Sequence, residues 1–384
     1  MKRRIAQYLV FIIALVCCFS SSNAMAKSLG EYDDSLEIHA ENYTYEFIQS
    51  QILSNDALCE WNDTTKINNV VALYNINEDI NGYIFNLSTN DMPKGYLHLD
   101  YISGIFKVRS YSFNGIHELY GLQEVYGISN MMKKSSKVYY NGWSSYWTKI
   151  SEDKFESLVS PQKIILTKDK LQEEYYEHLS KEEDDVELRS YESGTTMVSG
   201  YTSESSLSLV QMSLYSGLTI NGTTVTDHCT PTAGTNIIKY YALIKGFSAL
   251  RPSTDKAVFT DMYKEMDTNF NQSGGGFSGT YFDPFYSDGY AGLKSYCTLY
   301  NKTPVYYDRT YWFPSFSEVC SIISNKNAPL LMTLNNFDGT SGYHSVVVFG
   351  YKDSRIIIAT GWDQSLHYYT YSSLNVTEYS YVGW

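Results

Sequence analysis

The chain has 384 residues and carries 29 Lys and Arg against 42 Asp and Glu, a formal net charge of −13 at pH 7. This acidic balance argues against a nucleic-acid-binding protein, which needs a basic face for phosphates. Hydrophobic residues make up 43% of the chain and charged residues 18%, which excludes a largely disordered protein. The length allows two or three domains of ordinary size.

The first 26 residues have the three parts of a secretory signal peptide. Positions 2–4 are basic, residues 9–19 form an apolar run, and residues 24–26 read Ala-Met-Ala, a small-x-small cleavage pattern. The apolar run is too short to span a bilayer. We therefore expect an exported protein, cut after residue 26, that has no membrane contact once the leader is removed. An uncleaved membrane anchor is the alternative.

Residues 27–160 are expected to form an antiparallel sheet with a helix or two on one face. Apolar spacing over residues 42–55 predicts a short amphipathic helix. Alternating β-branched and aromatic residues then predict four strands, at 70–76, 82–88, 95–102 and 105–112. Turn sequences separate these strands, as in a meander.

Residues 161–206 differ in composition from both flanks. The segment begins with a charged, helix-permissive run and ends in a Ser/Thr/Gly-rich stretch. One interpretation is a solvated helix and loop. The other is an exposed, cleavable linker between two domains.

Residues 207–384 predict an α+β domain in which a helical half precedes a β half. The expected helices are at 229–245, 255–268 and 315–327, and the expected strands at 329–334, 343–351, 355–360 and 367–374. A Gly-rich loop at 272–279 is either a mobile cleft wall or a plain surface turn. No phosphate-binding Gly motif and no zinc-like His/Cys spacing is present, so no cofactor or metal is expected.

Cys229 is the strongest candidate for chemistry. It stands where a loop turns into a helix, because Pro231 is tolerated only in a first helical turn. Unpaired amides at a helix start stabilise a thiolate, the nucleophilic form of cysteine. The alternative is a buried cysteine that only fills space. The pairing of Cys297 with Cys320 is left open by the sequence.

A nucleophilic cysteine needs a base, and His344 is the best candidate. It opens a strongly apolar strand, where a titratable side chain needs a reason. The alternative is a core histidine with satisfied hydrogen bonds.

The pattern CTPTAGTNIIKYY from residue 229, followed by GYHSVVVFGY and a strand ending in Gly-Trp, resembles the papain-like cysteine peptidases of bacteria, of the streptopain or bacteriocin-processing type. The resemblance covers roughly residues 207–384. Residues 68–100 separately resemble the prosegment of streptopain-type zymogens, which would fold against the catalytic domain and block its cleft until removed. An unrelated β-rich binding module is the alternative for this region.

The resemblance implies a role for each site residue. Cys229 would be the nucleophile and His344 the general base and acid. The family has an Asn before a Trp to orient the imidazole, but the matching stretch here has Trp362 and no Asn. Asp363 is then the expected third residue, with Thr360 as a weaker candidate, and Trp362 would shield the hydrogen bond of the histidine from water.

The oxyanion donor departs from the family pattern as well. The family has Gln six residues before the cysteine, where this chain has Thr223. Gln211 is the expected donor, with Asn221 as an alternative, and the backbone N–H of Cys229 would be the second donor.

The sequence therefore predicts a secreted zymogen made of a signal peptide (1–26), a prodomain (27–160), a linker (161–206) and a catalytic domain (207–384). Its expected partners are a protein or peptide substrate and its own prodomain as an intramolecular inhibitor. Two other functions stay open: an inactive papain-like binding or adhesion protein, and a cysteine-dependent acyltransferase or amidase.

Overall fold

The computed structural model describes residues 32–54, 56–125, 137–142, 145–159, 164–183, 194–202, 207–270, 279–281, 287–311, 313–337 and 342–384. The predicted signal peptide lies outside these ranges, as does most of the Gly-rich loop. The chain divides into two units at Asn42, within helix α2 (Tyr32–Leu53). The second unit, Tyr43–Trp384, carries every strand that the structure describes.

The N-terminal half of this unit contains the predicted meander. Its elements are β1 (Lys66–Tyr74), β2 (Ile80–Thr89), β3 (Met92–Ile102), β4 (Ile105–Ser112), α3 (Glu118–Val125), β5 (Val138–Tyr140), β6 (Tyr146–Ser151) and β7 (Lys154–Ser157). Strands β1 to β4 pair antiparallel in sequence order. Phe47 of α2 packs edge-on against Tyr111 of β4 with ring centroids 5.1 Å apart, so the second half of α2 lies on the sheet.

The segment predicted as a linker holds regular structure where it is described. Strand β8 (Ile165–Thr167) pairs with β7, and helix α4 (Lys168–Glu183) follows it, as the charged, helix-permissive composition indicated. Strand β9 (Thr195–Met197) pairs antiparallel with β14 of the C-terminal half. Residues 184–193 lie outside the described part, and the domain boundaries stay predictions.

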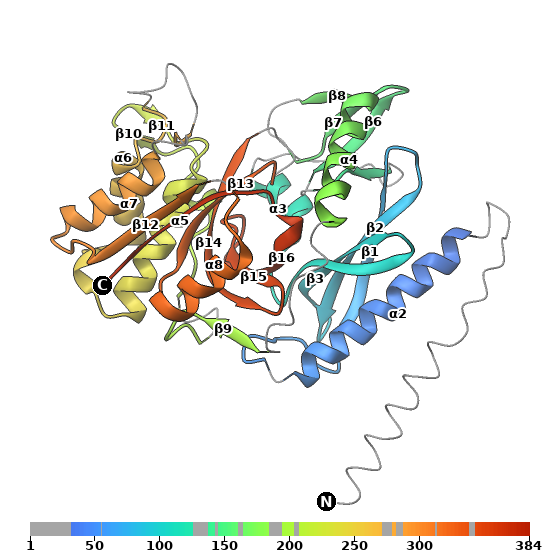
Figure 1. The fold of residues 1–384 in the computed structure, drawn as a ribbon, viewed down its shortest axis with the longest axis horizontal. Helices are drawn as coiled ribbons and strands as arrows, with labels where there is room; N and C mark the ends of the chain where they lie inside the picture. Colours follow the sequence, from blue (N-terminus) through green and yellow to red (C-terminus); the bar gives the residue numbers. More distant parts are fainter. Residues whose placement is uncertain are drawn as a thin grey trace, which may run out of the picture. The chain divides into compact units, whose positions relative to one another are not determined.

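The C-terminal half has a helical part followed by strands, as predicted, and Figure 1 shows α5, α6 and α7 gathered beside the C-terminal strands. Its elements are η2 (Met212–Leu214), β10 (Thr219–Ile220), β11 (Thr223–Thr224), α5 (Cys229–Lys239), η3 (Tyr240–Ile244), η4 (Ser248–Leu250), α6 (Asp255–Glu265), α7 (Asp288–Leu299), β12 (Tyr306–Tyr311), α8 (Phe316–Ser321), η5 (Ile322–Lys326), β13 (Leu330–Asn335), β14 (Tyr343–Lys352), β15 (Arg355–Ala359), β16 (His367–Thr370), η6 (Tyr371–Ser373) and β17 (Val376–Gly383). The fold is therefore mixed α and β, with one large sheet and several helices.

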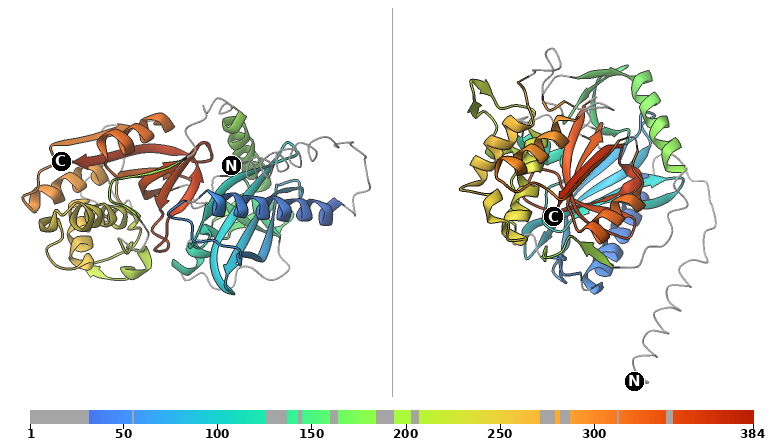
Figure 2. Two further views of the ribbon diagram at one scale, coloured as in Figure 1. Left: turned by 90° about the horizontal axis from the view of Figure 1, so that it is seen from below. Right: turned by 60° about the vertical axis from the view of Figure 1, so that its left-hand side comes forward.

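One sheet joins the two halves of the second unit. Its strand order in the described residues is β12-β17-β13-β14-β15-β16-β4-β3-β2-β1-β5-β6-β7-β8, and the link between the halves is the pairing of β16 with β4. Both views in Figure 2 show the red C-terminal strands next to the blue and teal N-terminal strands. This pairing brings the N-terminal half to the segment between β15 and β16, which carries Trp362 and Asp363.

None of the helices in the described residues is both long enough and apolar enough to cross a membrane. The four described cysteines, Cys59, Cys229, Cys297 and Cys320, form no disulfide with one another. Burial raises the pKa of Cys297 and that of Cys320 to about 12, so these two thiols stay protonated at neutral pH.

Candidate active site

Cys229 is the first residue of α5, and its side chain is half-buried. Asp227 adopts a left-handed conformation with φ of 44°, which turns the chain into the helix, and the N–H of Thr232 closes the first turn on the carbonyl of His228. Pro231 therefore stands in the first turn, as expected from its missing N–H. The N–H of Cys229 is one of the helix-start amides that have no partner within the helix itself.

The start of α5 lies against the start of β14. Thr230 follows Cys229 and Ser345 follows His344, and the hydroxyl oxygens of Thr230 and Ser345 are 2.8 Å apart in a buried hydrogen bond. The structure thus brings together the two segments that carry the predicted nucleophile and the predicted base, which are 115 residues apart in the sequence.

His344 is buried against two aromatic rings that also stack on each other, with the centroids of Phe337 and Trp362 5.0 Å apart. Its imidazole stacks on Trp362 with centroids 4.9 Å apart and on Phe337 with centroids 5.7 Å apart. Its Nε2 lies 2.8 Å from the carbonyl oxygen of Thr360. Because a carbonyl only accepts hydrogen bonds, this nitrogen carries the proton, and the lone pair of the neutral ring is on Nδ1.

The structure places Asp363 with another histidine. One carboxylate oxygen accepts from Nε2 of His367 at 3.0 Å and from the N–H of Ser365, and the other accepts from the N–H of Ile116 at 2.8 Å. Burial alone would raise the pKa of Asp363, but the neighbouring His367 and the two amides outweigh it and lower the pKa. These partners join Asp363 to His367 and to the N-terminal half, and its expected role in orienting His344 stays a prediction.

Thr360 was the weaker candidate for the third residue, and it contacts His344 through its backbone rather than its side chain. Its hydroxyl accepts a long 3.4 Å hydrogen bond from the N–H of Trp362. A backbone carbonyl is present at every position and has no residue-type signature, so sequence reasoning had no signal by which to find it. Trp362 lies where the sequence expectation put it, beside the histidine.

Gln211 lies in a segment that is tied to both sides of the site. The amide of Asn236 in α5 binds the N–H and the carbonyl of Val210, at 2.8 and 2.9 Å. On the other side of Gln211, Met212 donates its N–H to the carbonyl of Gly361 at 2.7 Å, and its carbonyl accepts from Nε2 of His228 at 2.8 Å. These contacts hold Gln211 between the Cys229 helix and the Thr360–Trp362 loop.

The side chain of Gln211 and the two other positions considered for the oxyanion donor, 221 and 223, lie in different places. The side chain of Gln211 donates to the hydroxyl of Ser213 at 2.7 Å, so the amide is near the site but engaged locally. Asn221 is an exposed residue in the turn between β10 and β11, and Thr223 lies in β11. Neither belongs to the segment that contacts α5 through Asn236. His228, which the sequence did not single out, anchors that segment.

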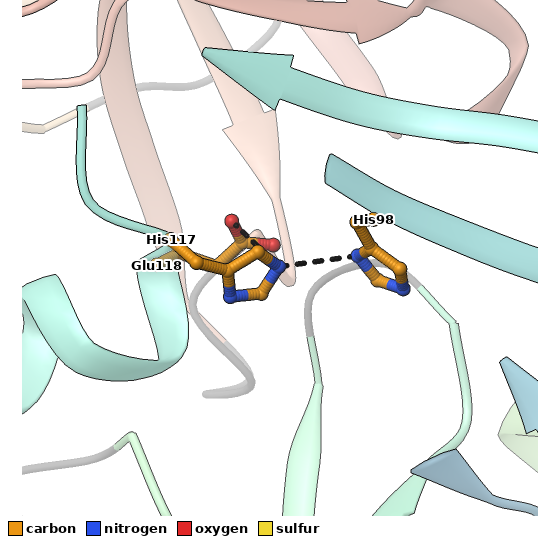
Figure 3. A group of neighbouring side chains, drawn as sticks. All are labelled: His98, His117 and Glu118. Carbon is orange, nitrogen blue, oxygen red and sulfur yellow. Dashed lines mark hydrogen bonds and ion pairs between the residues drawn. The ribbon is translucent and has the colours of Figure 1, made fainter. Parts of the chain in front are cut away.

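One group of side chains in the N-terminal half has the composition of a metal site. Ligand atoms of His98, His117 and Glu118 lie within 4.8 Å of one another (Figure 3). A metal-bound histidine normally keeps a proton on its second nitrogen, but Nδ1 of His117 accepts a hydrogen bond from the N–H of Leu119. The positive charge of Arg109 also acts on both histidines, which disfavours a second cation. The donor set therefore fits a hydrogen-bonded network better than a divalent ion.

Comparison with known proteins points to one family. Residues 208–382 match the Peptidase_C39 like family. A crystal structure of a C39-like peptidase from Bacillus anthracis aligns with a TM-score of 0.31 and 13% sequence identity, covering 50% of this chain and 98% of the other. No curated protein matches the chain. The family match supports a papain-like cysteine peptidase in residues 208–382.

Proposed function

We propose that this protein is a secreted cysteine peptidase zymogen, with Cys229 as nucleophile and His344 as general base and acid. The observation that carries the proposal is the buried hydrogen bond between Thr230 and Ser345, because it joins the start of the Cys229 helix to the start of the His344 strand. The family match of residues 208–382 agrees with it.

The hydrogen bond from His344 to Thr360 supports the assignment of the base. With its proton on Nε2, the neutral ring carries its lone pair on Nδ1, the nitrogen that would take the thiol proton of Cys229. The thiolate attacks the carbonyl carbon of the peptide bond, the imidazolium returns the proton to the leaving amine, and water hydrolyses the thioester. Trp362 and Phe337 stack against the buried ring, and in this proposal they shield the His344–Thr360 hydrogen bond from water.

The oxyanion of the tetrahedral intermediate needs donors aimed at its position. The N–H of Cys229, at the start of α5, supplies one donor. Gln211 supplies the second, because Asn236 and His228 hold its backbone near the helix start and its amide has another N–H besides the one that binds Ser213.

The N-terminal half is proposed to act as the inhibitory prodomain. The N–H of Ile116 binds Asp363, and a Cβ placed on Gly121 of α3 would lie 3.4 Å from Cβ of Trp362. Residues 116–121 thus pack on the segment that carries Trp362, the ring that covers His344. A cover at this place supports an enzyme that is kept inactive until the N-terminal half is removed.

The decisive variant is Cys229→Ala in the full chain. We expect it to abolish casein hydrolysis and any self-cleavage within residues 161–206, because no other described thiol begins a helix beside His344. Activity on casein and the mass of the purified protein are the measurements. Cys59→Ala is the matched control, since Cys59 is a half-buried thiol whose pKa burial raises, and it should keep wild-type activity.

Labelling of the Cys229 thiol separates the peptidase from an inactive binding protein. Iodoacetamide at mildly acidic pH should label Cys229 rapidly in an active enzyme, because an ordinary thiol is protonated there. Casein hydrolysis by Cys229→Ala at the wild-type rate would overturn the proposal.

A further inference from the structure

Two histidines in the N-terminal half are completely buried and contact each other. His98 lies on β3, and His117 lies just before α3, with its Nε2 3.2 Å from Nδ1 of His98 (Figure 3). Neither belongs to the proposed catalytic machinery. His117 nevertheless directly precedes α3, whose Gly121 lies against Trp362.

The hydrogen bonds of the pair fix where each proton lies. The N–H of Leu119 donates to Nδ1 of His117 at 3.2 Å, so this nitrogen has no proton, and the proton of the neutral ring lies on Nε2. Nε2 of His117 then donates to Nδ1 of His98. His98 carries its own proton on Nε2, which faces a carboxylate oxygen of Asp100 at 3.5 Å.

This order leaves no place for an additional proton. A second proton on His117 would sit on Nδ1, directly opposite the N–H of Leu119. A second proton on His98 would sit on Nδ1, opposite the N–H of His117. In either case two donors would face each other in a buried site, which costs the hydrogen bond and the desolvation of both groups.

Groups from several elements face the pair. They are Glu118 of α3, Asp100 and Tyr96 of β3, Arg109 of β4, Tyr140 of β5, Tyr146 of β6, and His367 and Tyr369 of β16. The carboxylate of Glu118 accepts from the hydroxyls of Tyr146 and Tyr369, at 2.8 and 2.9 Å. Burial lowers the pKa of His117 to about 4 although Glu118 opposes this shift, and burial, the neighbouring His117 and Arg109 hold the pKa of His98 well below its usual range.

The element that depends on the pair is the start of α3. The side chain of His117 caps this helix by accepting from Leu119, and the preceding residue, Ile116, donates its N–H to Asp363. Gly121, one turn further, packs on Trp362. Loss of the cap would therefore loosen the N-terminal half where it lies on the proposed active site.

We propose that His98 and His117 form an acid-sensitive latch: protonation of His117 breaks the cap of α3, protonation of His98 breaks the hydrogen bond that positions His117, and either change releases residues 116–121 from the Trp362 segment. The inference rests on the proposed peptidase function and adds its regulation. At neutral pH the latch is closed and covers the site. Mild acid opens it before any peptide bond is cut.

The direction and range of the effect follow from linkage. Because the pKa of each ring is lower in the closed form than its ordinary value of about 6.5, the closed form is fully stable above that pH and loses stability as the pH falls toward the value in the closed form. Each ring contributes up to about tenfold per pH unit to the ratio of open to closed molecules. The pKa values of Glu118 and Asp363 are also lowered, but for a carboxylate this means that its contribution is lost only below about pH 4.

The test uses full-length Cys229→Ala, which cannot cut itself, and measures amide hydrogen exchange of residues 117–121 between pH 7 and 4.5, corrected for the intrinsic exchange rate. We expect protection to fall by about tenfold or more between pH 6.5 and 4.5. Adding His117→Asn should weaken this dependence, because the Asn oxygen still caps Leu119 but does not titrate. Adding His98→Gln to that variant should remove it. His39→Asn, an exposed histidine on α2, is the control and should behave as the parent.

The possible outcomes separate the latch from the peptidase. Unchanged protection down to pH 4.5, or the same acid step with and without the His98 and His117 substitutions, would overturn the latch. Acid opening of Cys229→Ala together with no hydrolysis by the wild type would keep the latch and overturn the peptidase. Hydrolysis by the wild type without an acid step would overturn the latch alone.

Discussion

The proton on Nε2 of His344 is directed at a main-chain carbonyl, which fixes the tautomer without a second titratable group. A carbonyl has no pKa in the working range, so the orientation of this imidazole does not change with pH as it would beside a carboxylate. Asp363 meanwhile orients His367 and holds the amide of Ile116. At the level of single residues, Asp363 thus serves the contact between the two halves, and a backbone group serves the proposed base.

Asp363→Asn tests this division of roles. We expect kcat/KM of the processed enzyme to change by no more than about twofold, because the variant leaves the Thr360 carbonyl in place. The full-length protein should lose about 1–3 kcal/mol of unfolding free energy at pH 7, because His367 and Ile116 lose a charged acceptor. Urea unfolding and steady-state kinetics measure the two effects.

The pH dependence gives a second check on Asp363. Its pKa is lowered in the folded protein, so its stabilisation is complete above about pH 4 and disappears as the pH falls through the folded value. The difference in unfolding free energy between wild type and Asp363→Asn should therefore shrink in acid. A loss of about a hundredfold or more in kcat/KM with unchanged stability would return Asp363 to the catalytic role.

Residue chemistry was predicted where the residue type itself carries the signal. Pro231 located the helix start at Cys229, and an isolated histidine at the head of an apolar strand drew attention to His344. The partner of His344 and the anchoring role of His228 depend on backbone carbonyls of Thr360 and Met212, which no sequence pattern marks.

At the scale of elements, the site depends on how α5 sits on β14. One face of α5 packs on β13 and β14. At the ends of α5 and β14 that carry Cys229 and His344, the buried hydrogen bond between Thr230 and Ser345 adds a specific contact. It fixes the position of the helix start along the strand. The predicted helices and strands of this half were found with small shifts: the helix expected at 229–245 is α5 followed by a π-helical turn, and the strand expected at 367–374 ends at Thr370.

A double-mutant cycle on Thr230 and Ser345 measures this contact. Thr230→Val and Ser345→Ala should each lower the free energy of unfolding by about 1–3 kcal/mol. Each substitution removes one of the two buried hydroxyls and takes this hydrogen bond from the other. The double variant should cost less than the sum by about 0.5–3 kcal/mol. Each single variant should also lower kcat, since the helix start is no longer fixed against β14.

Thr235→Val is the matched control for this cycle. Thr235 is buried on the same helix, but its hydroxyl donates to the carbonyl of Pro231 and not to β14. Removal of the Thr235 hydroxyl should lower the free energy of unfolding but should not lower kcat beyond that effect. Equal kcat values for Thr230→Val and Thr235→Val would show that the Thr230–Ser345 contact does not position the catalytic groups.

Several elements had weak or misleading sequence signals. Helix α2 begins at Tyr32, well before the apolar spacing that predicted a helix from residue 42, because its first turns are polar and exposed where described. Helix α7 and strands β12 and β17 were not predicted, although β17 alternates in a strand-like way. Tyrosine-rich segments such as Tyr306–Tyr311 suit strands, but they are spread through this chain and single out no one segment.

At the scale of the whole second unit, the pairing of β4 with β16 makes a single sheet from two halves that were predicted as separate domains. This pairing joins residues more than 250 positions apart, and local periodicity contains no information about such distant partners. Side chains reinforce it: Ser112 donates to the carbonyl of Leu366 at 2.7 Å, and Arg109 to that of Ser373 at 2.9 Å.

A second connection lies at the opposite end of β14 from His344. The ion pair of Lys352 and Asp56 is 2.8 Å long, and both side chains are less than a tenth exposed. Thr195 of β9 also donates to Asp56 at 2.7 Å, so a strand within the predicted linker joins the same cluster. Burial would raise the pKa of Asp56, but Lys352 and these hydrogen bonds lower it.

These connections predict that cutting the linker does not by itself separate the halves. We expect Cys229→Ala with a site for a sequence-specific protease inserted in residues 184–193 to be cut into two fragments that elute together by size-exclusion chromatography at pH 7. The continuous sheet and the buried Lys352–Asp56 pair hold them, since neither depends on the integrity of the linker. At pH 4.5 a larger fraction of the fragments should elute separately, because the open His98–His117 latch removes the contact of residues 116–121 with the Trp362 segment and leaves the β4–β16 pairing and the Lys352–Asp56 pair to hold the fragments. Lys352→Met, which leaves Asp56 buried without its cation, should shift separation toward neutral pH. Fragments that part at pH 7 in the unsubstituted protein would show that the interface is weaker than this pairing implies, and that cleavage alone activates the enzyme.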